Sequence, residues 1–322
     1  MKSGTNPHSA SRSSTPSRLV LVLVGPTASG KTATSLCVAS RLGAEILSAD
    51  SRQIYKYMDI GTAKPSREER KNIKHYFVDE LTPDQDFNSG EYGTRGREII
   101  DDIFRRRKVP LVVGGSGLYV QALVDGFFEG PSAHPELRRH LEGRMKTEGA
   151  ESLLEELRRI DPVAASGMLP STTRRIVRAL EVHTLSGTPI SELHKSRHKI
   201  DFSPVFVGLQ WDRKALYDRI NKRAEQMIEQ GLIDEVKQLI ARGFSPDLNA
   251  LQTTGYQEAF QFLEGKISHD RMVELIKQNT RRYAKRQLTW FRRDKRIRWF
   301  EVEDEKDLPR VAGGICEYFL DG

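Results

Sequence analysis

The stretch RLVLVLVGPTASGKT, residues 18–32, decides the fold class of this 322-residue chain. Residues 19–24 are a continuous apolar run rich in valine, which is typical of a strand buried on both faces of a parallel sheet. The run ends where Gly25–Thr32 begins, and these eight residues fit the pattern GxxxxGK[ST]. Residues 33–42 then carry apolar side chains at helical spacing up to Gly43, where a helix C-cap is expected. The stretch predicts a strand, a phosphate-binding loop and a helix in succession.

Strand and helix patterns alternate further along the chain. Apolar runs at 44–49 and 109–113 predict two more core strands, with a charged helix at 91–107 before the second. Two further strands are predicted at 204–211 and 297–302. Such alternation implies a right-handed, mostly parallel sheet. With the glycine-rich motif, it predicts an α/β fold like that of the P-loop-containing nucleoside triphosphate hydrolases.

Composition divides the chain into parts, and its length suits one large unit and a smaller one. Residues 1–17 are rich in Ser, Thr and Pro and have no apolar centre, so we expect a disordered tail, with a short organellar transit peptide as the alternative. Charged helical patterns predict a helical insertion domain at 125–200. Segments 18–124 and 201–322 then form the α/β core, and the second of them is mostly helical.

Bulk composition is that of a soluble globular protein. Hydrophobic residues make up 38% and charged residues 30% of the chain, and no apolar run approaches the roughly 20 residues that span a bilayer. We therefore expect no membrane association. Cys37 and Cys316 are the two cysteines, too few for a disulfide scaffold, which favours a reducing compartment and a cytoplasmic location.

The basic charge of the chain lies in one short segment. Residues 281–298 contain nine Lys or Arg and one acid, Asp294, whereas the whole chain has a net charge of +7. Tyr283, Trp290 and Trp299 lie within or beside this segment. Basic side chains interleaved with aromatic rings suit a polyanion with stackable bases, but a solvated helix face has the same charge pattern, so the segment by itself leaves both interpretations open.

The Gly25–Thr32 loop has the context that a phosphate site requires, because it lies between a predicted strand and a predicted helix. Its glycines let backbone N–H groups turn toward a phosphate, and the helix N-terminus adds its positive end. Lys31 supplies a point charge, and the hydroxyl of Thr32 is a candidate ligand for Mg²⁺, the one cofactor that we expect.

Neighbouring strand ends indicate which phosphorylated ligand the loop binds. The strand at 109–113 ends in GGSG without the carboxylate that usually holds Mg²⁺ in nucleotide hydrolases. Asp50 ends the strand at 44–49, and the carboxyl ends of parallel strands meet at one edge of the sheet. We expect Asp50 near the bound phosphate, where it would accept a proton from an attacking amine or organise Mg²⁺; a helix N-cap is the structural alternative.

Seven motifs in order carry a family resemblance. They are GPTASGKT at 25–32, DSRQIY at 50–55, MDIGTAKP at 58–65, GGSGLY at 114–119, RIVRALEV at 175–182, GYQE at 255–258 and TRRYAKRQLTWFR at 280–292. Together they resemble the tRNA dimethylallyltransferases of bacterial type, over about 19–300. The resemblance implies transfer of a dimethylallyl group from dimethylallyl diphosphate to the exocyclic N6 amine of the adenosine 3′ of the anticodon, position 37.

Roles follow from this resemblance residue by residue. It implies that Asp50 is the general base, that Thr27 orients the substrates and that Ser116 lines the reaction channel. Arg219 and Arg223 lie four residues apart on one predicted helix face and match the family's diphosphate-contacting region. The sequence does not decide which of the two contacts the diphosphate. The whole loop would hold the diphosphate: Gly25, Pro26, Thr27, Ala28, Ser29, Gly30, Lys31 and Thr32.

Four segments match the family's tRNA-contacting residues, and the last coincides with the start of the basic segment. The predicted partner is therefore the tRNA anticodon stem-loop, bound by a monomer. The segments are Asp50, Ser51, Arg52 and Gln53; Arg174, Arg175, Ile176, Val177 and Arg178; Gln252, Thr253, Thr254, Gly255, Tyr256 and Gln257; and Thr280, Arg281, Arg282, Tyr283, Ala284, Lys285, Arg286 and Gln287.

The sequence departs from the family pattern in places and leaves rivals open. Gln257 stands where the family usually has Lys or Arg, which removes one expected phosphate contact. His194 and His198 have metal-compatible spacing, but we interpret them as surface histidines because no third ligand is near. The alternatives are a transferase that prenylates free adenine nucleotides, a nucleotide kinase, and a non-catalytic RNA-binding protein. None of the three needs both Asp50 and the basic segment.

Overall fold

Six strands form one sheet in the computed structural model, which describes residues 18–126, 131, 134–195 and 200–321. Their order is β3-β2-β4-β1-β5-β6, and every neighbouring pair is parallel. This confirms the predicted α/β fold with a mostly parallel sheet. The bounds are β1 Leu19–Val24, β2 Ala44–Ser48, β3 His75–Tyr76, β4 Val109–Gly114, β5 Ser203–Trp211 and β6 Arg298–Val302.

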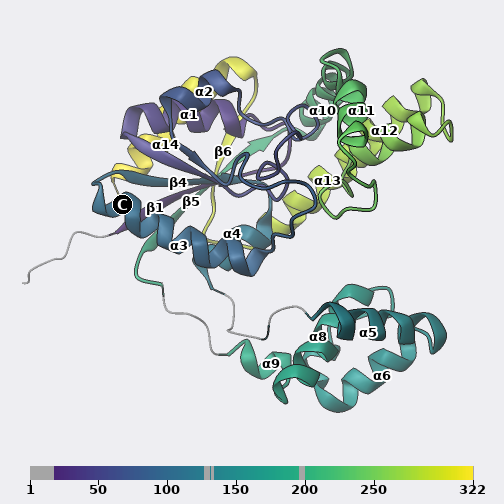
Figure 1. The fold of residues 1–322 in the computed structure, drawn as a ribbon. Coiled ribbons are helices and arrows are strands. Elements are labelled where there is room, and N and C mark those ends of the chain that lie inside the picture. The colour runs from purple at the N-terminus through teal and green to yellow at the C-terminus, as the bar shows by residue number, and fades with distance from the viewer. Residues whose placement is uncertain (1–17, 127–130, 132–133, 196–199, 322) are drawn as a thin grey trace, which may run out of the picture. The chain divides into compact units, whose positions relative to one another are not determined.

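Helices cover the sheet on both faces (Figure 1). Helices α1 and α14 pack against each other on one face, and α3 lies across the other. The helices that precede α5 or follow β5 have these bounds, in chain order: α1 Lys31–Leu42, α2 Arg67–Asn72, α3 Ser89–Arg105, α4 Gly117–Val124, α10 Arg213–Glu229, α11 Leu232–Ala241, α12 Tyr256–Leu263, α13 His269–Phe291, the 3₁₀ turn Glu305–Asp307 and α14 Leu308–Leu320.

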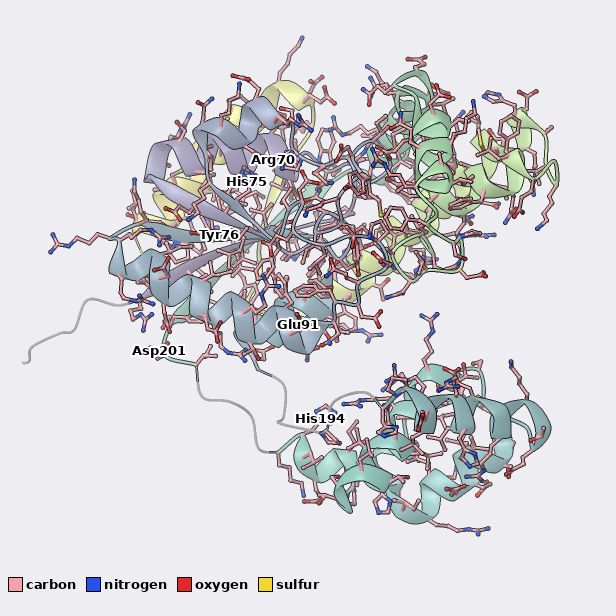
Figure 2. All side chains as sticks on the ribbon, viewed as in Figure 1. Arg70, His75, Tyr76, Glu91, His194 and Asp201 are labelled. Carbon is pink, nitrogen blue, oxygen red and sulfur yellow. The ribbon has the colours of Figure 1, made fainter. Side chains whose placement is uncertain are left out.

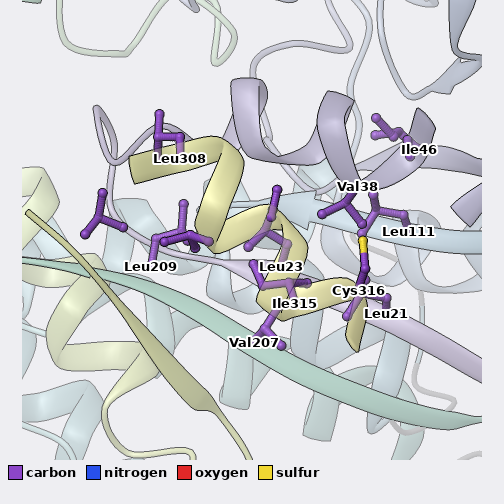
Figure 3. Close-up of a cluster of buried hydrophobic side chains, with 14 of the residues drawn as sticks. Leu21, Leu23, Val38, Ile46, Leu111, Val207, Leu209, Leu308, Ile315 and Cys316 are labelled. Atoms are coloured by element: carbon purple, nitrogen blue, oxygen red, sulfur yellow. The ribbon is translucent and has the colours of Figure 1, made fainter. Parts of the chain in front are cut away.

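The core lies between the central strands and the α1/α14 pair. Residues 20–24 of β1 are fully buried, because neighbouring strands flank β1 and helices cover both of its faces. Leu21 and Leu23 pack with Val38 of α1 and Ile315 of α14 (Figure 3). Burial of each such side chain contributes about 1.5–3 kcal/mol. This packing fixes the end of β1, and with it the start of the glycine-rich loop.

The sheet edge at β3 was not predicted, because two-residue strands leave no apolar run. Polar side chains gather there (Figure 2): the Tyr76 hydroxyl donates a hydrogen bond to Glu45 at 2.8 Å, and Arg70 forms an ion pair with Asp79 at 2.7 Å. His75 makes a 2.7 Å contact between Nδ1 and the carbonyl of Ile73. A short edge strand flanked by charge offers little surface for pairing with another sheet.

Contacts divide the chain into two units. The first comprises the described residues of Met1–Asn88, Arg95–Val120 and Asp201–Gly322, and the second those of Ser89–Thr94 and Gln121–Ile200. Residues 1–17, for which we predict a disordered tail, lie outside the described ranges. No helix in those ranges is long and apolar enough to cross a bilayer.

The second unit is helical and has a core of its own. Helices α5 Pro135–Thr147, α6 Ala150–Ile160, α7 Pro162–Ala165, α8 Thr173–Ser186 and α9 Ile190–Leu193 follow one another, and apolar side chains from α5, α6, α7 and α8 form the core. The fully buried Glu181 of α8 accepts hydrogen bonds from Arg138 and Arg178, each at 2.8 Å, and from the backbone N–H of His134 at 2.9 Å. A buried carboxylate needs such partners, so this cluster fixes α5 against α8.

Candidate active site

The glycine-rich loop joins β1 to α1 at the carboxyl edge of the sheet. Gly30 has a φ of 88°, and a Cβ there would lie 2.8 Å from Leu308, so both backbone and space require glycine. The Lys31 ammonium donates a hydrogen bond to the carbonyl of Pro26 at 2.6 Å, across the loop. Ser29 Oγ is buried without a partner in the described part of the chain. Together with the first N–H groups of α1, this makes a cradle suited to an anion.

The end of β2 lies directly beside the end of β4. A Cβ on Gly114 would lie 2.1 Å from the carbonyl oxygen of Ala49, so only glycine allows this approach. The same oxygen accepts a hydrogen bond from the Ser116 N–H at 3.0 Å. Ser116 Oγ in turn accepts one from the N–H of Ser51 at 3.1 Å. The structure thus brings Asp50, the residue between Ala49 and Ser51, to the GGSG turn.

Asp50 shares its surroundings with two cations. One of its carboxylate oxygens accepts a hydrogen bond from the Arg52 N–H at 2.9 Å, which orients the side chain. Burial and, to a smaller extent, the charge of Arg223 lower the pKa of Lys31 to about 7, whereas Asp50 opposes the shift. Burial also lowers the pKa of Arg223, again opposed by Asp50. Two partly desolvated cations beside one carboxylate leave a net positive site, so an anion would stabilise it.

The two arginines of α10 have different surroundings. Arg219 Nε donates to the carbonyl of Ala28 at 2.8 Å, its guanidinium lies 4.2 Å from the Trp211 ring centroid, and it pairs with Glu305. Arg219 therefore supports the loop from outside. Arg223, one turn later, has no hydrogen bond or ion pair to any residue that the structure describes, and its charge acts on Lys31. Arg223 is the arginine left free for a ligand.

Helix α13 presents one face to these loops. Tyr283, Gln287 and Trp290 follow one another at helical spacing and meet the GGSG turn or the glycine-rich loop. The Tyr283 hydroxyl lies near Ser116 and Asp50, and although the residue exposes 36% of its surface, its phenol end is desolvated. This burial, with the charge of Asp50, raises the pKa of Tyr283 to about 12. The phenol therefore stays neutral near the carboxylate.

The turn at 59–61 is held by a side chain that sequence reasoning missed. Glu235 of α11 accepts hydrogen bonds from the N–H groups of Asp59 and Ile60, both at 2.8 Å, from Gly61 at 3.2 Å, and from the Tyr256 hydroxyl at 2.6 Å. Burial raises the pKa of Tyr256, and Glu235 raises it further. No motif marks Glu235, which lies on an ordinary amphipathic helix.

The predicted tRNA-contacting residues of the first unit separate into exposed and buried sets. Exposed are Gln252, Arg282, Tyr283, Lys285 and Arg286; partly exposed are Asp50, Ser51, Arg52, Gln53, Thr253, Thr254, Gln257, Thr280 and Arg281; buried are Gly255, Tyr256, Ala284 and Gln287. Gln53 is bound within its own loop, to Ser48 and to the carbonyls of Thr62 and Ala63. The exposed basic members therefore concentrate on α13.

The predicted contacts at 174–178 lie on α8 of the helical unit. Arg174 and Arg175 are exposed, whereas Ile176 and Val177 belong to that unit's core. Arg178 is committed to Glu181 and to the carbonyl of Pro131 at 2.9 Å. Two exposed arginines remain available for an external partner from this segment.

No group of three or more His, Cys, Asp or Glu side chains suited to a metal occurs in the ranges that the structure describes. His194 follows α9 in the helical unit (Figure 2), and His198 lies outside the described residues. Candidate donors for Mg²⁺ at the glycine-rich loop include the Thr32 hydroxyl and the Asp50 carboxylate. Mg²⁺ at phosphate sites takes one or two protein ligands and completes its shell with phosphate and water, so this sparse donor set fits it.

The fold and the site define a class. The glycine-rich loop follows the central strand and faces two cations, and a carboxylate lies at the end of a strand two places away in the sheet. This arrangement is that of a P-loop-like fold whose loop suits a phosphorylated ligand and which also carries a candidate base. The sequence pattern of the family described as IPP transferase matches residues 53–294. The chain belongs to this family.

Similar proteins and solved structures support the same family assignment. The chain is 43% identical over 307 residues to the tRNA dimethylallyltransferase of Thermoanaerobacter sp. (strain X514), and the alignment covers 93% of this chain and 96% of the relative. It resembles the crystal structure of the full-length tRNA isopentenylpyrophosphate transferase from Bacillus halodurans with a TM-score of 0.68 and 38% identity, covering 94% and 98% of the two chains. A eukaryotic dimethylallyltransferase acting on tRNA gives a TM-score of 0.80 at 27% identity, covering 95% and 80%.

Proposed function

We propose that this protein is a tRNA dimethylallyltransferase. It transfers a dimethylallyl group from dimethylallyl diphosphate to N6 of the adenosine at position 37 of tRNA, giving N6-(dimethylallyl)adenosine and diphosphate. The observation that carries this proposal is Asp50, a carboxylate at the end of β2 whose charge acts on Lys31 and Arg223 of the phosphate site. A nucleotide kinase does not need a base that accepts a proton from an aromatic amine. Transfer of a dimethylallyl group to such an amine needs both that base and stabilisation of the departing diphosphate.

Bond changes in the transfer assign the roles. The exocyclic nitrogen of adenosine attacks C1 of the dimethylallyl group as the C1–O bond breaks, and the electron pair leaves with the diphosphate. The nitrogen loses one proton, which Asp50 accepts. Because this amine is a weak nucleophile, the rate depends on positioning, on the nearby base and on stabilisation of the departing charge.

The leaving group is held by the loop and its cations. The N–H groups at the start of α1 point to the cradle, and Lys31 and Arg223 supply positive charge where the diphosphate develops its own. Thr27, partly exposed in the loop, orients the two substrates, and Ser116 lines the path between them. Arg219 acts indirectly, through the loop backbone that it supports.

Mg²⁺ is proposed as the cofactor. Thr32 would hold it, with Asp50 near enough to organise its waters, and when bound it supplies further neutralisation of the diphosphate charge. The residues of the chain bind and orient the substrates and hold the transferred proton.

The acceptor is proposed to approach over α13. A base stacked in an anticodon loop is inaccessible, so it must be extruded into a pocket before it reacts. The exposed Arg282, Lys285 and Arg286 of α13 suit the phosphates of the loop, and Tyr283 of the same helix lies near Ser116 and Asp50. RNA bound along this helix would place its extruded base beside Asp50.

Replacement of the base tests the assignment. Asp50→Ala is expected to lower transfer of labelled dimethylallyl to tRNA at least about a hundredfold, because a positioned general base contributes that much or more. Binding of tRNA, measured by filter retention, should change little, since the RNA phosphates meet α13. Asp50→Asn is the matched control, which keeps shape and removes basicity. Retained turnover in both variants, or lost tRNA binding with retained turnover, would contradict the role.

A further inference from the structure

Gln287 joins two loops of the site. Its side-chain oxygen accepts a hydrogen bond from the backbone N–H of Thr27 at 2.8 Å, and its amide nitrogen donates one to the carbonyl of Gly115 at 2.9 Å. The residue is 6% exposed, so water does not compete for these bonds. One side chain of α13 therefore links the glycine-rich loop to the turn after β4.

The residues around this bridge are closely packed. A Cβ on Gly115 would lie 2.1 Å from the amide nitrogen of Gln287. Nearly one turn further along α13, a Cβ on Gly117 would lie 2.2 Å from the indole of Trp290. The glycines of the GGSG turn therefore admit α13 at contact distance, and a shift of the helix would move Gln287 relative to Thr27.

The opposite face of α13 is exposed and basic. Arg282 and Lys285 lie on it, Arg286 lies at its border beside Tyr283, and none of the three has an acidic partner among the residues that the structure describes. Ala284 and Gln287, which lie between these positions in the sequence, are buried, so the buried and the exposed faces of α13 are distinct. The helix thus offers cations to an external polyanion on one side and holds the diphosphate loop on the other.

We propose that Gln287 is a positioning residue that couples tRNA on the basic face of α13 to the diphosphate in the glycine-rich loop. The inference rests on the proposed function. RNA phosphates that fix α13 also fix the Gln287 amide, which holds the Thr27 N–H and the Gly115 carbonyl in place around the cradle. Because binding linkage is reciprocal, each substrate then raises the affinity of the other by the same factor.

The experiment measures that factor directly. The probe is a dimethylallyl diphosphate analogue with sulfur in place of the bridging oxygen, which binds without rapid transfer, and its dissociation constant is determined by calorimetry with and without saturating tRNA. For the unaltered protein we expect tRNA to tighten the analogue at least about fivefold, the lower end of typical coupling.

Two variants remove the bridge in different ways. Gln287→Met keeps the length and removes both hydrogen bonds, and Gln287→Glu keeps an acceptor for the Thr27 N–H but loses the donor to Gly115. Each should reduce the coupling to below about twofold, while each substrate alone still binds. Thr289→Ala is the matched control on α13, because Thr289 is exposed and, among the described residues, its side chain bonds only the Lys285 carbonyl of its own helix.

Separate readouts distinguish the outcomes. Circular dichroism and thermal unfolding report whether a variant folds, and if Gln287→Met does not, Gln287→Glu decides the result. Unchanged coupling in a folded Gln287 variant, or absence of coupling in the unaltered protein, overturns the proposal. Failure of the proposed function gives a different result, namely no transfer of labelled dimethylallyl to tRNA by the unaltered protein.

Discussion

Lys31 should make diphosphate binding depend on pH near neutrality. Its pKa is lowered to about 7, mainly by burial, so the ammonium of the free protein titrates in the physiological range. A bound diphosphate favours the charged form and raises that pKa again. Binding therefore takes up a proton, and affinity falls as pH rises above 7.

The magnitude follows from the fraction of Lys31 that is protonated. That fraction falls from about nine-tenths at pH 6 to about one-tenth at pH 8, so affinity for the bridging-sulfur analogue should fall about tenfold, or about 1.4 kcal/mol. At pH 8 each binding event should take up about 0.9 proton. Calorimetry in two buffers of different ionisation enthalpy measures this uptake.

Neighbouring charges set the direction of shifts in variants. Asp50 raises the pKa of Lys31, so Asp50→Asn should move the loss of affinity to lower pH; Arg223 lowers it, so Arg223→Gln should move the loss to higher pH. Lys31→Met is the control and should take up no proton through this group. Constant affinity from pH 6 to 8, or uptake that persists in Lys31→Met, would refute the reasoning.

Two further predictions concern RNA and the loop at 58–65. Arg282→Glu should weaken tRNA binding and lower the slope of log affinity against log salt by about 1. Arg281→Glu should have a smaller effect, because Arg281 is less exposed and bonds Asn221 at 2.5 Å, whereas the bond of Arg282 to Asn279 is long, at 3.4 Å; equal slopes in filter binding would contradict this. Glu235→Ala should lower the free energy of unfolding by about 2 kcal/mol in urea titration, because backbone N–H groups lose a charged acceptor. Unchanged unfolding would mean that these bonds contribute nothing.

The sheet could be predicted because its strands are buried on both faces. The runs that became β1 and β4 are continuous apolar stretches, and a parallel sheet brings their carboxyl ends to one edge. That geometry alone placed Asp50 near the glycine-rich loop. β3 was missed because two residues carry no periodic signal. α14 was missed because its apolar face packs on α1, and the sequence does not show that the two helices are neighbours.

The roles of Gln287 and Glu235 could not be predicted. Motif matching grouped Gln287 with its exposed basic neighbours, since a sequence motif does not tell which face of a helix is buried. Glu235 is one charged residue among many on an amphipathic helix, and its four acceptor contacts come from residues at 59–61 and 256. The same limit left Arg219 and Arg223 equivalent until the folded loop showed which is committed to its backbone.

The central claim is that the acceptor is tRNA. Unaltered protein is incubated with labelled dimethylallyl diphosphate and Mg²⁺, and with total tRNA, AMP or ATP as the acceptor. We predict label in tRNA, in a nucleoside that digestion identifies as N6-(dimethylallyl)adenosine, and none in the free nucleotides. Preferential labelling of AMP or ATP, or transfer of a phosphoryl group in place of the dimethylallyl group, would contradict the account.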